Sequence, residues 1–525
     1  MSTIKEGLLA DMDRRVADHI LERQNAELLK KLIAGAADDN EAMSIAELGT
    51  TYKRTGLHFD KRLERMTNSI HYLRRVPELS FSTDPQKPTH RLVIGDNYPA
   101  LQNLLVQYRG GVDVIYIDPP YGKDSMGEFA KTNYENAISR DNLLSMLWPR
   151  LQLARMLLSD SGVIFCSIDD RNQAYVKCLF DEVFGENNFV ATIVWQKIHS
   201  IKNDARYLSD CHEYLLMYAC NINVAEINLL PRTAEMNARY KNPDNDPRGP
   251  WQSGDLVASG ERRNGHFIVT NPRTGCSFDV PQGKHWVYSE ENMKELVVSN
   301  SLYFGVNGDA FPRKKRFLSE VQSGRTPGTL WMSEEVGHNQ SATKEVISIF
   351  GERGKFDFPK PVQLIQQCIQ IASKPDSVVL DFFAGSGTTG HAVLELNRQE
   401  EEARDLFDTG EKGQRQFILV QMDEKTDATP NGIARDVTAE RLRRIMTGKA
   451  SDGTADFDWI KRHTPYGGNL EVLEVATVAN FEGTEGRTPA DVIDETVYGL
   501  PPFAQLRDKM DWLCTNFSQT QKSAD

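Results

Sequence analysis

Hydrophobic and polar positions follow two different patterns along the chain. Residues 1 to about 88 show helix-like periodicity, as in ADHILERQNAELLKKLIAG, followed by a polar break at residues 37–41. From residue 91, short β-branched apolar runs such as RLVIGD and VDVIYI alternate with helical patterns such as NYPALQNLLVQYRG. Strands that alternate with helices indicate a parallel sheet with crossover helices. We therefore predict a helical extension over residues 1–88 and an α/β domain that begins at residue 89.

The alternation stops between residues 200 and 345, where Asn, Pro, Gly and Trp are frequent, as in YKNPDNDPRGPWQSGD. It returns with SVVLDFFAGSGTTGHAVLELN and RQFILVQMDE, and beyond residue 450 the sequence is acidic and irregular. The pattern predicts one α/β domain made of residues 89–199 and 346–450. A loop-rich domain, residues 200–345, is inserted in it, and residues 451–525 form a C-terminal extension.

The composition is that of a soluble globular protein, with 40% apolar and 26% charged residues among 525. No apolar run approaches the length of a membrane span, and the first residues lack the apolar stretch of a signal peptide, so we expect a cytoplasmic location. The seven cysteines form no C-x-x-C pair, and neither they nor His212 show metal-ligand spacing. We expect no metal site, and cysteines that are reduced and mostly in the core.

The charge is unevenly distributed. A net charge of −13 argues against a protein that coats nucleic acid indiscriminately, because phosphate contacts need Lys and Arg. Residues 196–345, however, contain eighteen Lys and Arg and eighteen Asp and Glu, so this segment repels DNA least. It also holds four consecutive cations, which are either a DNA contact or a solvated surface face: Arg313, Lys314, Lys315 and Arg316. Its aromatic residues are expected in the core: Tyr240, Trp251, Trp286, Tyr288 and Trp331.

The first candidate for chemistry is the sequence Asp118, Pro119, Pro120, Tyr121, directly after the strand VDVIYI. Ligands bind at the carboxyl ends of strands in sheets of this kind. The Asp118 carboxylate and the Pro119 carbonyl can accept the two hydrogens of an exocyclic amine and aim its lone pair at a methyl donor. Tyr121 can stack on an extruded base. The alternative is a simple turn, since Asp and Pro favour turns.

The second candidate is DFFAGSGTTG, residues 381–390, between the strand SVVL and a helix. Its glycines allow a ligand to approach the backbone closely, as in nucleotide-binding turns. A phosphate site is the alternative. No Lys follows Gly387 as a P-loop requires, and Asp381 repels phosphate but suits the ammonium of a methionine moiety. This balance favours S-adenosylmethionine as the ligand.

The order of these motifs, D-P-P-Y before a long insert and then F-x-G-x-G, resembles the β-class amino-methyltransferases of DNA. Between residues 90 and 450 the chain is similar in particular to the modification subunits of type III restriction-modification systems, through blocks such as IGDNYPALQNLL, HEYLLMYA, FGVNGDAFPRKKRFLSEV and FPKPVQLI. The resemblance implies a Rossmann-like, circularly permuted methyltransferase sheet and an inserted target-recognition domain. It also implies a homodimer on double-stranded DNA, with a restriction (nuclease-helicase) subunit as a further partner.

The resemblance assigns roles to further positions. Asp96 stands where the family contacts the cofactor's adenine, and Lys360 where a cation meets the methionine carboxylate. Gln421 occupies the ribose position, with Asp423 two residues on. The residues of the glycine-rich turn line the cofactor or donate hydrogen bonds to it: Phe383, Gly385, Ser386, Gly387, Thr388 and Thr389.

The predicted reaction is a direct transfer of a methyl group from S-adenosylmethionine to N6 of a flipped adenine, with no metal ion. Two alternatives remain open. The acceptor is N4 of cytosine or an RNA base in the first, although cytosine-N4 enzymes of this kind usually carry Ser in place of Asp118. In the second, the chain is a recognition module that places a separate nuclease-helicase on DNA.

Overall fold

The computed structural model describes residues 3–17, 21, 23–48, 65–66, 69–121, 140–200, 206–260, 262–322, 324–407, 413–479, 488–517 and 522–523. The chain divides into two units, residues 1–59 and 60–525. The first unit holds the helices α1 (Thr3–Ala17), α2 (Arg23–Gly35) and α3 (Asp39–Leu48). They share a small core that includes Met12, Ile33 and Ala42. None of the described helices combines the length and apolar character that crossing a membrane requires.

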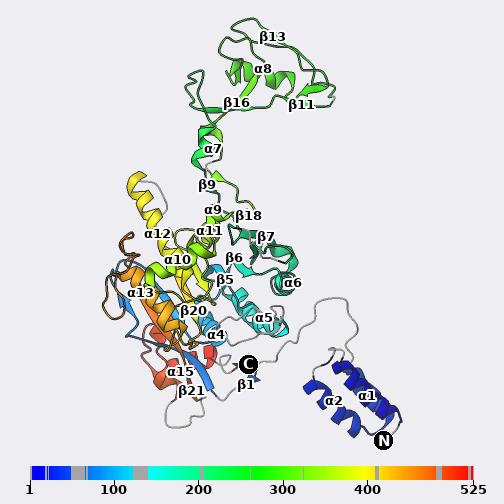
Figure 1. The fold of residues 1–525 in the computed structure, drawn as a ribbon, viewed down its shortest axis with the longest axis vertical. Coiled ribbons are helices and arrows are strands. Elements are labelled where there is room, and N and C mark those ends of the chain that lie inside the picture. Colours follow the sequence, from blue (N-terminus) through cyan, green and yellow to red (C-terminus); the bar gives the residue numbers. More distant parts are fainter. Residues whose placement is uncertain are drawn as a thin grey trace. The chain divides into compact units, whose positions relative to one another are not determined.

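The second unit is built on an eleven-stranded sheet, counted over the described residues (Figure 1). Ten strands follow one another across it in this order: β18 (Leu330–Trp331), β7 (Phe189–Gln196), β8 (His212–Ala219), β6 (Leu158–Ile168), β5 (Val112–Ile117), β19 (Val378–Asp381), β20 (Gln416–Gln421), β4 (Thr89–Ile94), β21 (Asn469–Ala479) and β2 (Ser69–Arg75). The short β3 (Phe81–Ser82) pairs with β21. The six strands from β6 to β21 are parallel, which confirms the predicted α/β fold.

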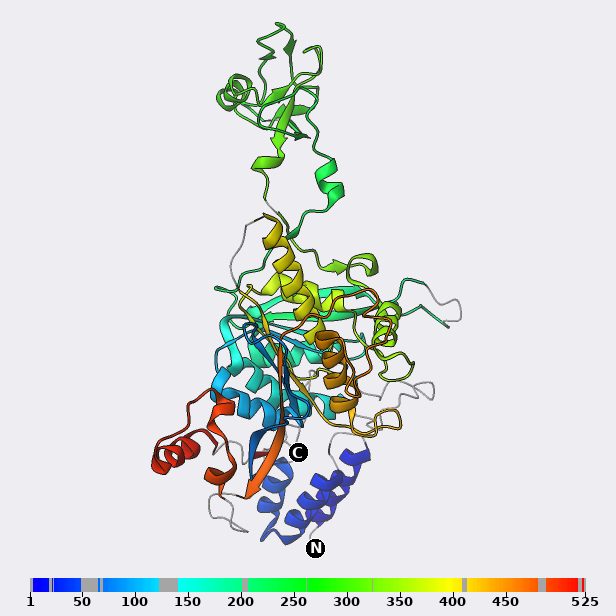
Figure 2. The same ribbon diagram turned by 90° about the vertical axis from the view of Figure 1, so that its left-hand side faces the viewer.

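Helices lie on both faces of this sheet (Figure 2). The residues Val114 and Tyr116 of β5 point to one face, where they share a core with apolar residues of α11, α12 and α13. The parallel strands are buried on both faces, which explains their near-continuous apolar sequences. The helices of this layer system are α4 (Asn97–Tyr108), α5 (Arg140–Leu157), α6 (Gln173–Phe184), α10 (Asn339–Phe350), α11 (Val362–Ala372), α12 (Thr388–Phe407) and α13 (Glu440–Thr447), the last preceded by a π-helical turn (Ala434–Ala439).

Several predicted boundaries were wrong. The helical extension does not reach residue 88, because β2 and β3 belong to the sheet. β8 and β18 also belong to it, although both fall within the predicted insert. The C-terminal extension contributes β21, the neighbour of β4, and then α14 (Pro489–Val492) and α15 (Leu506–Phe517). Only Cys166 and Cys368 of the seven cysteines are buried, so the expectation of mostly core cysteines was wrong as well.

The insert nevertheless has a core of its own, formed by Leu256, Val269, Trp286, Met293, Leu302 and Phe304. We call residues 232–323 the recognition lobe. The predicted burial of Trp251, Trp286 and Trp331 is confirmed, whereas Tyr240 and Tyr288 are only partly buried. The lobe and its flanks contain β9 (Leu230–Pro231), α7 (Ala234–Ala238), β10 (Trp251–Gly254), β11 (Val257–Ser259), β12 (Val269–Thr270), β13 (Ser277–Phe278), β14 (Lys284–Trp286), α8 (Glu290–Val298), β15 (Leu302–Tyr303), β16 (Arg313–Phe317) and β17 (Gly324–Arg325).

Candidate active site

Four predicted site segments meet at one edge of the sheet. β5, β19, β20 and β4 are consecutive parallel neighbours, so their carboxyl ends lie together. Asp118 follows β5, Asp381 ends β19, Gln421 ends β20, and Asp96 follows β4 by two residues. β5 and β19 come from sequence segments more than 250 residues apart, yet they pair side by side in the sheet. The structure therefore places the D-P-P-Y and glycine-rich motifs at adjacent strand ends, where α/β sheets bind ligands.

Asp118 forms an ion pair with Lys360 at this edge. Both carboxylate oxygens of Asp118 lie 2.8 Å from the Lys360 Nζ atom. The Tyr121 hydroxyl donates to Oδ1 of Asp118 at 3.0 Å and accepts from Lys360 at 3.2 Å. Glu213, at the start of β8, accepts from the same Tyr121 hydroxyl at 3.3 Å and lies 3.5 Å from Lys360 Nζ. The ammonium of Lys360 is thus directed at Asp118, Tyr121 and Glu213, and not at the open position expected for a cofactor carboxylate.

The electrostatics of this cluster follow from burial and from the cation at its centre. Burial raises the pKa of Asp118, and the Lys360 ammonium partly offsets that rise. Burial opposes the charge of Lys360, but the carboxylates of Asp118 and Glu213 outweigh it, and the pKa of Lys360 is raised. One cation therefore stabilises two partly buried carboxylates.

Asp381 holds the glycine-rich turn from inside. One carboxylate oxygen accepts from the Phe383 N–H at 2.9 Å and the other from the Thr389 hydroxyl at 2.5 Å. Burial raises the pKa of Asp381 to about 7, because these donors are neutral and Asp118 adds repulsion. Gly385 and Gly387 have φ angles of +52° and +79°, which favour glycine. A Cβ atom on Gly385 would also come within 3.0 Å of the Phe356 ring.

A buried arginine that the sequence reasoning missed supports the same turn. Arg441 on α13 donates to the hydroxyls of Ser386 and Thr388, both at 3.0 Å, and to Nδ1 of His391 at 3.0 Å. As acceptors from the guanidinium these two hydroxyls keep their own O–H donors, one of which is used between them at 3.1 Å, so donation to a cofactor stays a prediction. The spacing along the chain was a signal for its burial: Arg441 lies four residues after Val437 and four before Ile445, so a helix places it on the same face as these two apolar residues, and both are buried.

The three remaining cofactor candidates all have protein partners. Asp96 caps α4 by accepting from the Tyr98 N–H at 2.7 Å, and pairs with Arg150 at 3.0 Å. The Gln421 side chain accepts from the Gly385 N–H at 2.6 Å. Asp423 pairs with Arg435 at 2.8 Å, while its other carboxylate oxygen is buried and has no hydrogen-bond partner among the residues that the structure describes. The Gln421 side chain thus supports the glycine-rich turn by a hydrogen bond. Asp423, two residues further along the chain, keeps one carboxylate oxygen without a donor among the described residues.

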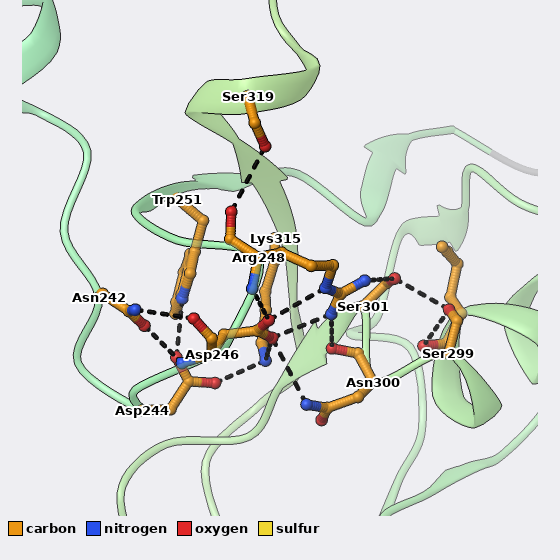
Figure 3. Close-up of polar contacts among 11 residues, drawn as sticks. Asn242, Asp244, Asp246, Arg248, Trp251, Ser299, Asn300, Ser301, Lys315 and Ser319 are labelled. Atoms are coloured by element: carbon orange, nitrogen blue, oxygen red, sulfur yellow. Dashed lines mark hydrogen bonds and ion pairs between the residues drawn. The ribbon is translucent and has the colours of Figure 1, made fainter.

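The four-cation run of the recognition lobe does not act as one surface. It forms strand β16, in which Lys315 points inward and has a side-chain exposure of 1%. Its Nζ lies 2.5 Å from Asp244 and 2.8 Å from Asp246, beside Arg248, Trp251 and Ser301 (Figure 3). Lys315 cannot contact DNA phosphates from this position, so its assignment as a DNA-binding residue was wrong.

The neighbours of Lys315 on β16 are more accessible. Arg313 and Arg316 are exposed, and Lys314 is half-buried and donates to the Tyr288 hydroxyl at 2.7 Å. The Arg316 side chain lies against Gly254 of the paired strand, where a Cβ atom would come within 2.7 Å of its Nε. The glycine therefore leaves room for the arginine to lie flat on the sheet.

Within the described ranges, no three His, Cys, Asp or Glu side chains gather in a way that could hold a metal ion.

Glu213 is the second residue that the sequence reasoning missed. Its signal was an acidic residue next to the apolar run YLLMYA, which is a central strand and not part of the insert.

Comparison with known proteins adds sequence relatives. The DNA methylase family matches residues 112–427, and a family described as an uncharacterised conserved protein matches residues 7–114. The Mod subunit of the type III restriction-modification enzyme StyLTI of Salmonella typhimurium is 31% identical over 79% of this chain and 67% of that protein. The EcoPI Mod subunit of Escherichia phage P1 is 30% identical over 70% of this chain and 63% of that protein.

The type II methyltransferase M.KpnI of Klebsiella pneumoniae is also similar, with 30% identity over 70% of this chain and 89% of that protein. The chain spans about two thirds of the length of the type III relatives. Among solved structures, the M1.HpyAVI–SAM complex has a TM-score of 0.29 and 15% identity, over 65% of this chain and 97% of that chain.

Proposed function

Because the chain belongs to the DNA methylase family, we propose that it transfers the methyl group of S-adenosylmethionine to N6 of an adenine flipped out of double-stranded DNA. The observation that carries this proposal is the position of the Asp118 carboxylate. It lies at the end of β5, beside β19, whose carboxyl end opens the glycine-rich turn. An amine acceptor and a cofactor turn at adjacent strand ends are what methyl transfer to an exocyclic amine requires.

The hydrogen bonds of Asp118 indicate which oxygen receives the amine. Oδ1 accepts from both Lys360 and Tyr121, whereas Oδ2 accepts from Lys360 alone among the described residues. A carboxylate oxygen accepts two hydrogen bonds, so Oδ2 retains one acceptor position for an N6 hydrogen. The Pro119 carbonyl takes the second hydrogen. The nitrogen lone pair, drawn out of the base ring, would then attack the sulfonium methyl carbon: the N–CH₃ bond forms, the C–S bond breaks, S-adenosylhomocysteine leaves with the electron pair, and one N6 proton is lost to solvent.

The residues of the glycine-rich turn fit S-adenosylmethionine. Gly385 and Gly387 leave backbone uncovered where any other residue would be strained. Asp381 would face the ammonium, Asp96 the adenine, and Phe383 would line the site, while Gln421 or Asp423 would serve the ribose. The cofactor supplies the electrophilic methyl group. We assign Lys360 to the orientation of Asp118 in place of its expected contact with the methionine carboxylate.

We further propose that the chain is the modification and recognition subunit of a restriction-modification system. The similarity to Mod subunits of type III restriction-modification enzymes supports a further subunit as partner. That this partner is a nuclease-helicase, and that the chain is a homodimer on double-stranded DNA, are parts of the same proposal. The similarity to M.KpnI extends to a type II methyltransferase, and co-purification tests whether this chain has such a partner. In the recognition lobe we assign DNA contacts to Arg313, Lys314 and Arg316. A cytoplasmic location stays a prediction.

Nucleoside analysis tests the reaction itself. The purified protein is incubated with unmethylated duplex DNA and methyl-labelled S-adenosylmethionine, and the product is digested to nucleosides. Label in N6-methyladenosine supports the proposal. Label in N4-methylcytosine, or transfer only to RNA, supports the first alternative, and DNA binding without transfer supports a recognition module.

A further inference from the structure

Glu213 has no part in the reaction described above, although it touches two members of the site. It is the second residue of β8, and its side chain is 10% exposed. Tyr214 pairs with Ile168, the last residue of β6, and Cys166 pairs with Ile117, the last residue of β5. Because β8 runs antiparallel to β6, it begins at the edge where the parallel strands end. The topology therefore brings an acidic residue from the start of one strand to the catalytic end of its neighbours.

We propose that Glu213 is a positioning residue that keeps Tyr121 and Lys360 turned to one side of Asp118, so that Oδ2 stays open to the target amine. The inference rests on the proposed function. Glu213 Oε2 accepts from the Tyr121 hydroxyl at 3.3 Å and lies 3.5 Å from Lys360 Nζ. Its other oxygen lies 3.4 Å from Lys197 Nζ. Lys197 therefore fixes the carboxylate from behind, and Oε2 faces the site.

The count of donors and acceptors shows why a second carboxylate is needed. Lys360 has three N–H donors and Tyr121 one O–H donor, and both lie beside a single carboxylate, that of Asp118. Without Glu213, the Tyr121 O–H and the Lys360 N–H that now donates to Tyr121 have only Asp118 as a carboxylate acceptor in this cluster, and a donor that turns to Oδ2 fills the position that the amine needs. Glu213 draws these donors away and leaves the lone pair for N6.

Glu213 also affects the charge of Asp118. Its carboxylate repels that of Asp118 and contributes to raising the pKa of Asp118, while Lys360 contributes in the opposite direction. The charged and titratable groups that face Glu213 lie on four segments: Asp118 and Tyr121 after β5, Asp169 after β6, Lys197 after β7, and Lys360 before α11.

The test is the pH dependence of single-turnover methylation by Glu213→Gln. Glutamine keeps the shape and one oxygen acceptor but loses the charge. We expect a rate about 10- to 100-fold lower, as for a small displacement of reacting groups, with unchanged cofactor and DNA affinity. We also expect the acidic limb of the pH–rate profile to move to lower pH, because removal of a neighbouring carboxylate makes Asp118 easier to ionise. Asp210→Asn is the matched control, since Asp210 pairs with the same Lys197 at 2.8 Å but its side chain is 66% exposed.

A second pair of variants covers the case in which Glu213→Gln fails to fold. Lys360→Gln should move the acidic limb to higher pH, and Glu213→Gln added to it should move the limb back. A double variant identical to Lys360→Gln, or a folded Glu213→Gln with the wild-type rate or an unmoved acidic limb, overturns the assignment. If the wild-type protein does not methylate adenine, the proposed function fails instead, so the two failures are distinguishable.

Discussion

Asp118 and Asp381 are carboxylates at strand ends, the first partly buried and the second fully buried, and their partners differ. Asp118 faces the ammonium of Lys360, whereas Asp381 accepts only from a backbone N–H and a hydroxyl among the described residues. The cation favours the charged form of Asp118, and the neutral donors leave the pKa of Asp381 raised to about 7. Environment thus separates a carboxylate suited to orienting an amine from one that holds a turn.

At this scale the first prediction concerns Asp118. Asp118→Asn keeps the turn and one oxygen acceptor but loses the charge that stabilises the developing positive nitrogen. Loss of one such preorganised contact costs about 10²- to 10³-fold in rate. Asp118→Ala should be at least as severe. Single-turnover methylation measures the loss, and parallel calorimetry should find cofactor binding intact. A mild effect would mean that Asp118 only closes the turn.

The second prediction separates Lys315 from Arg316. Lys315→Met removes one of the two cations that pair with the buried Asp246 and leaves Arg248 as its remaining cation, so it should cost about 1–3 kcal/mol of stability. Arg316→Ala should leave the melting temperature unchanged, and should lower the slope of log K for DNA against log salt by about 0.9. Thermal unfolding and DNA titrations at several salt concentrations check both. A salt slope that Arg316→Ala leaves unchanged would remove this residue from the DNA interface.

The same network predicts a pH dependence. Hydrogen bonds from Arg248 and Lys315 hold the pKa of Asp246 well below its usual range. A lowered pKa in the folded state means that the stability is fully present above the unfolded pKa, about 3.9, and is lost as pH falls below it. Wild-type protein should therefore lose stability between about pH 4 and pH 2 by more than Asp246→Asn does. Equal losses would contradict the assignment.

At the scale of elements, the sequence predicts which segments form buried strands and turns better than it predicts where the domains begin and end. The strands VDVIYI and SVVL, and the turns that follow them, were predictable because buried parallel strands are apolar throughout. The run RKKRF was read as one cationic patch, but a strand alternates its faces, so Lys315 and Phe317 point inward. The strand SIHYLRR has no apolar run, because only one of its faces is well buried. Arg441 lies at helical spacing from apolar residues, but that spacing does not show that α13 packs against the glycine-rich turn, so its role was missed.

The glycine-rich turn gives the element-scale prediction. Gly387→Ala places a side chain at φ +79° and 3.3 Å from Thr438 Cγ2, so it should weaken S-adenosylmethionine binding as well as stability. Gly110→Ala is the matched control, because Gly110 has φ +63° and no atom within 4 Å of its Cβ position. Both should lose about 1 kcal/mol of stability from backbone strain. Calorimetry should find weaker cofactor binding in Gly387→Ala alone, and equal affinities would mean that the cofactor turn is misplaced.

At the scale of the whole molecule, the sheet assembles strands from distant parts of the chain. β21 lies between β4 and β2, so residues 469–479 complete the side of the sheet next to β4 and β20. No local sequence pattern reveals such pairing, because strand neighbours are set by topology and not by proximity along the chain. The acidic, irregular sequence after residue 450 was therefore interpreted as an extension outside the α/β domain.

Two truncations test this organisation. A protein that ends at residue 468 lacks β21, leaves the edges of β4 and β2 unpaired, and should not fold to a soluble monodisperse state. A protein that begins at residue 60 lacks only the first unit and should still bind S-adenosylmethionine. Size-exclusion chromatography and calorimetry check both. A stable, cofactor-binding protein without residues 469–525 would contradict the account of the sheet.

The central claim is that this chain methylates adenine at N6 in specific DNA sequences through Asp118. The most direct measurement expresses the wild-type protein and Asp118→Ala in a host without adenine methylation and maps modified bases across the genome. The account predicts N6-methyladenine at one recurring sequence in cells with the wild-type protein, and none with Asp118→Ala present at equal abundance. Methylation of cytosine in place of adenine, or equal adenine methylation by the two proteins, would contradict it.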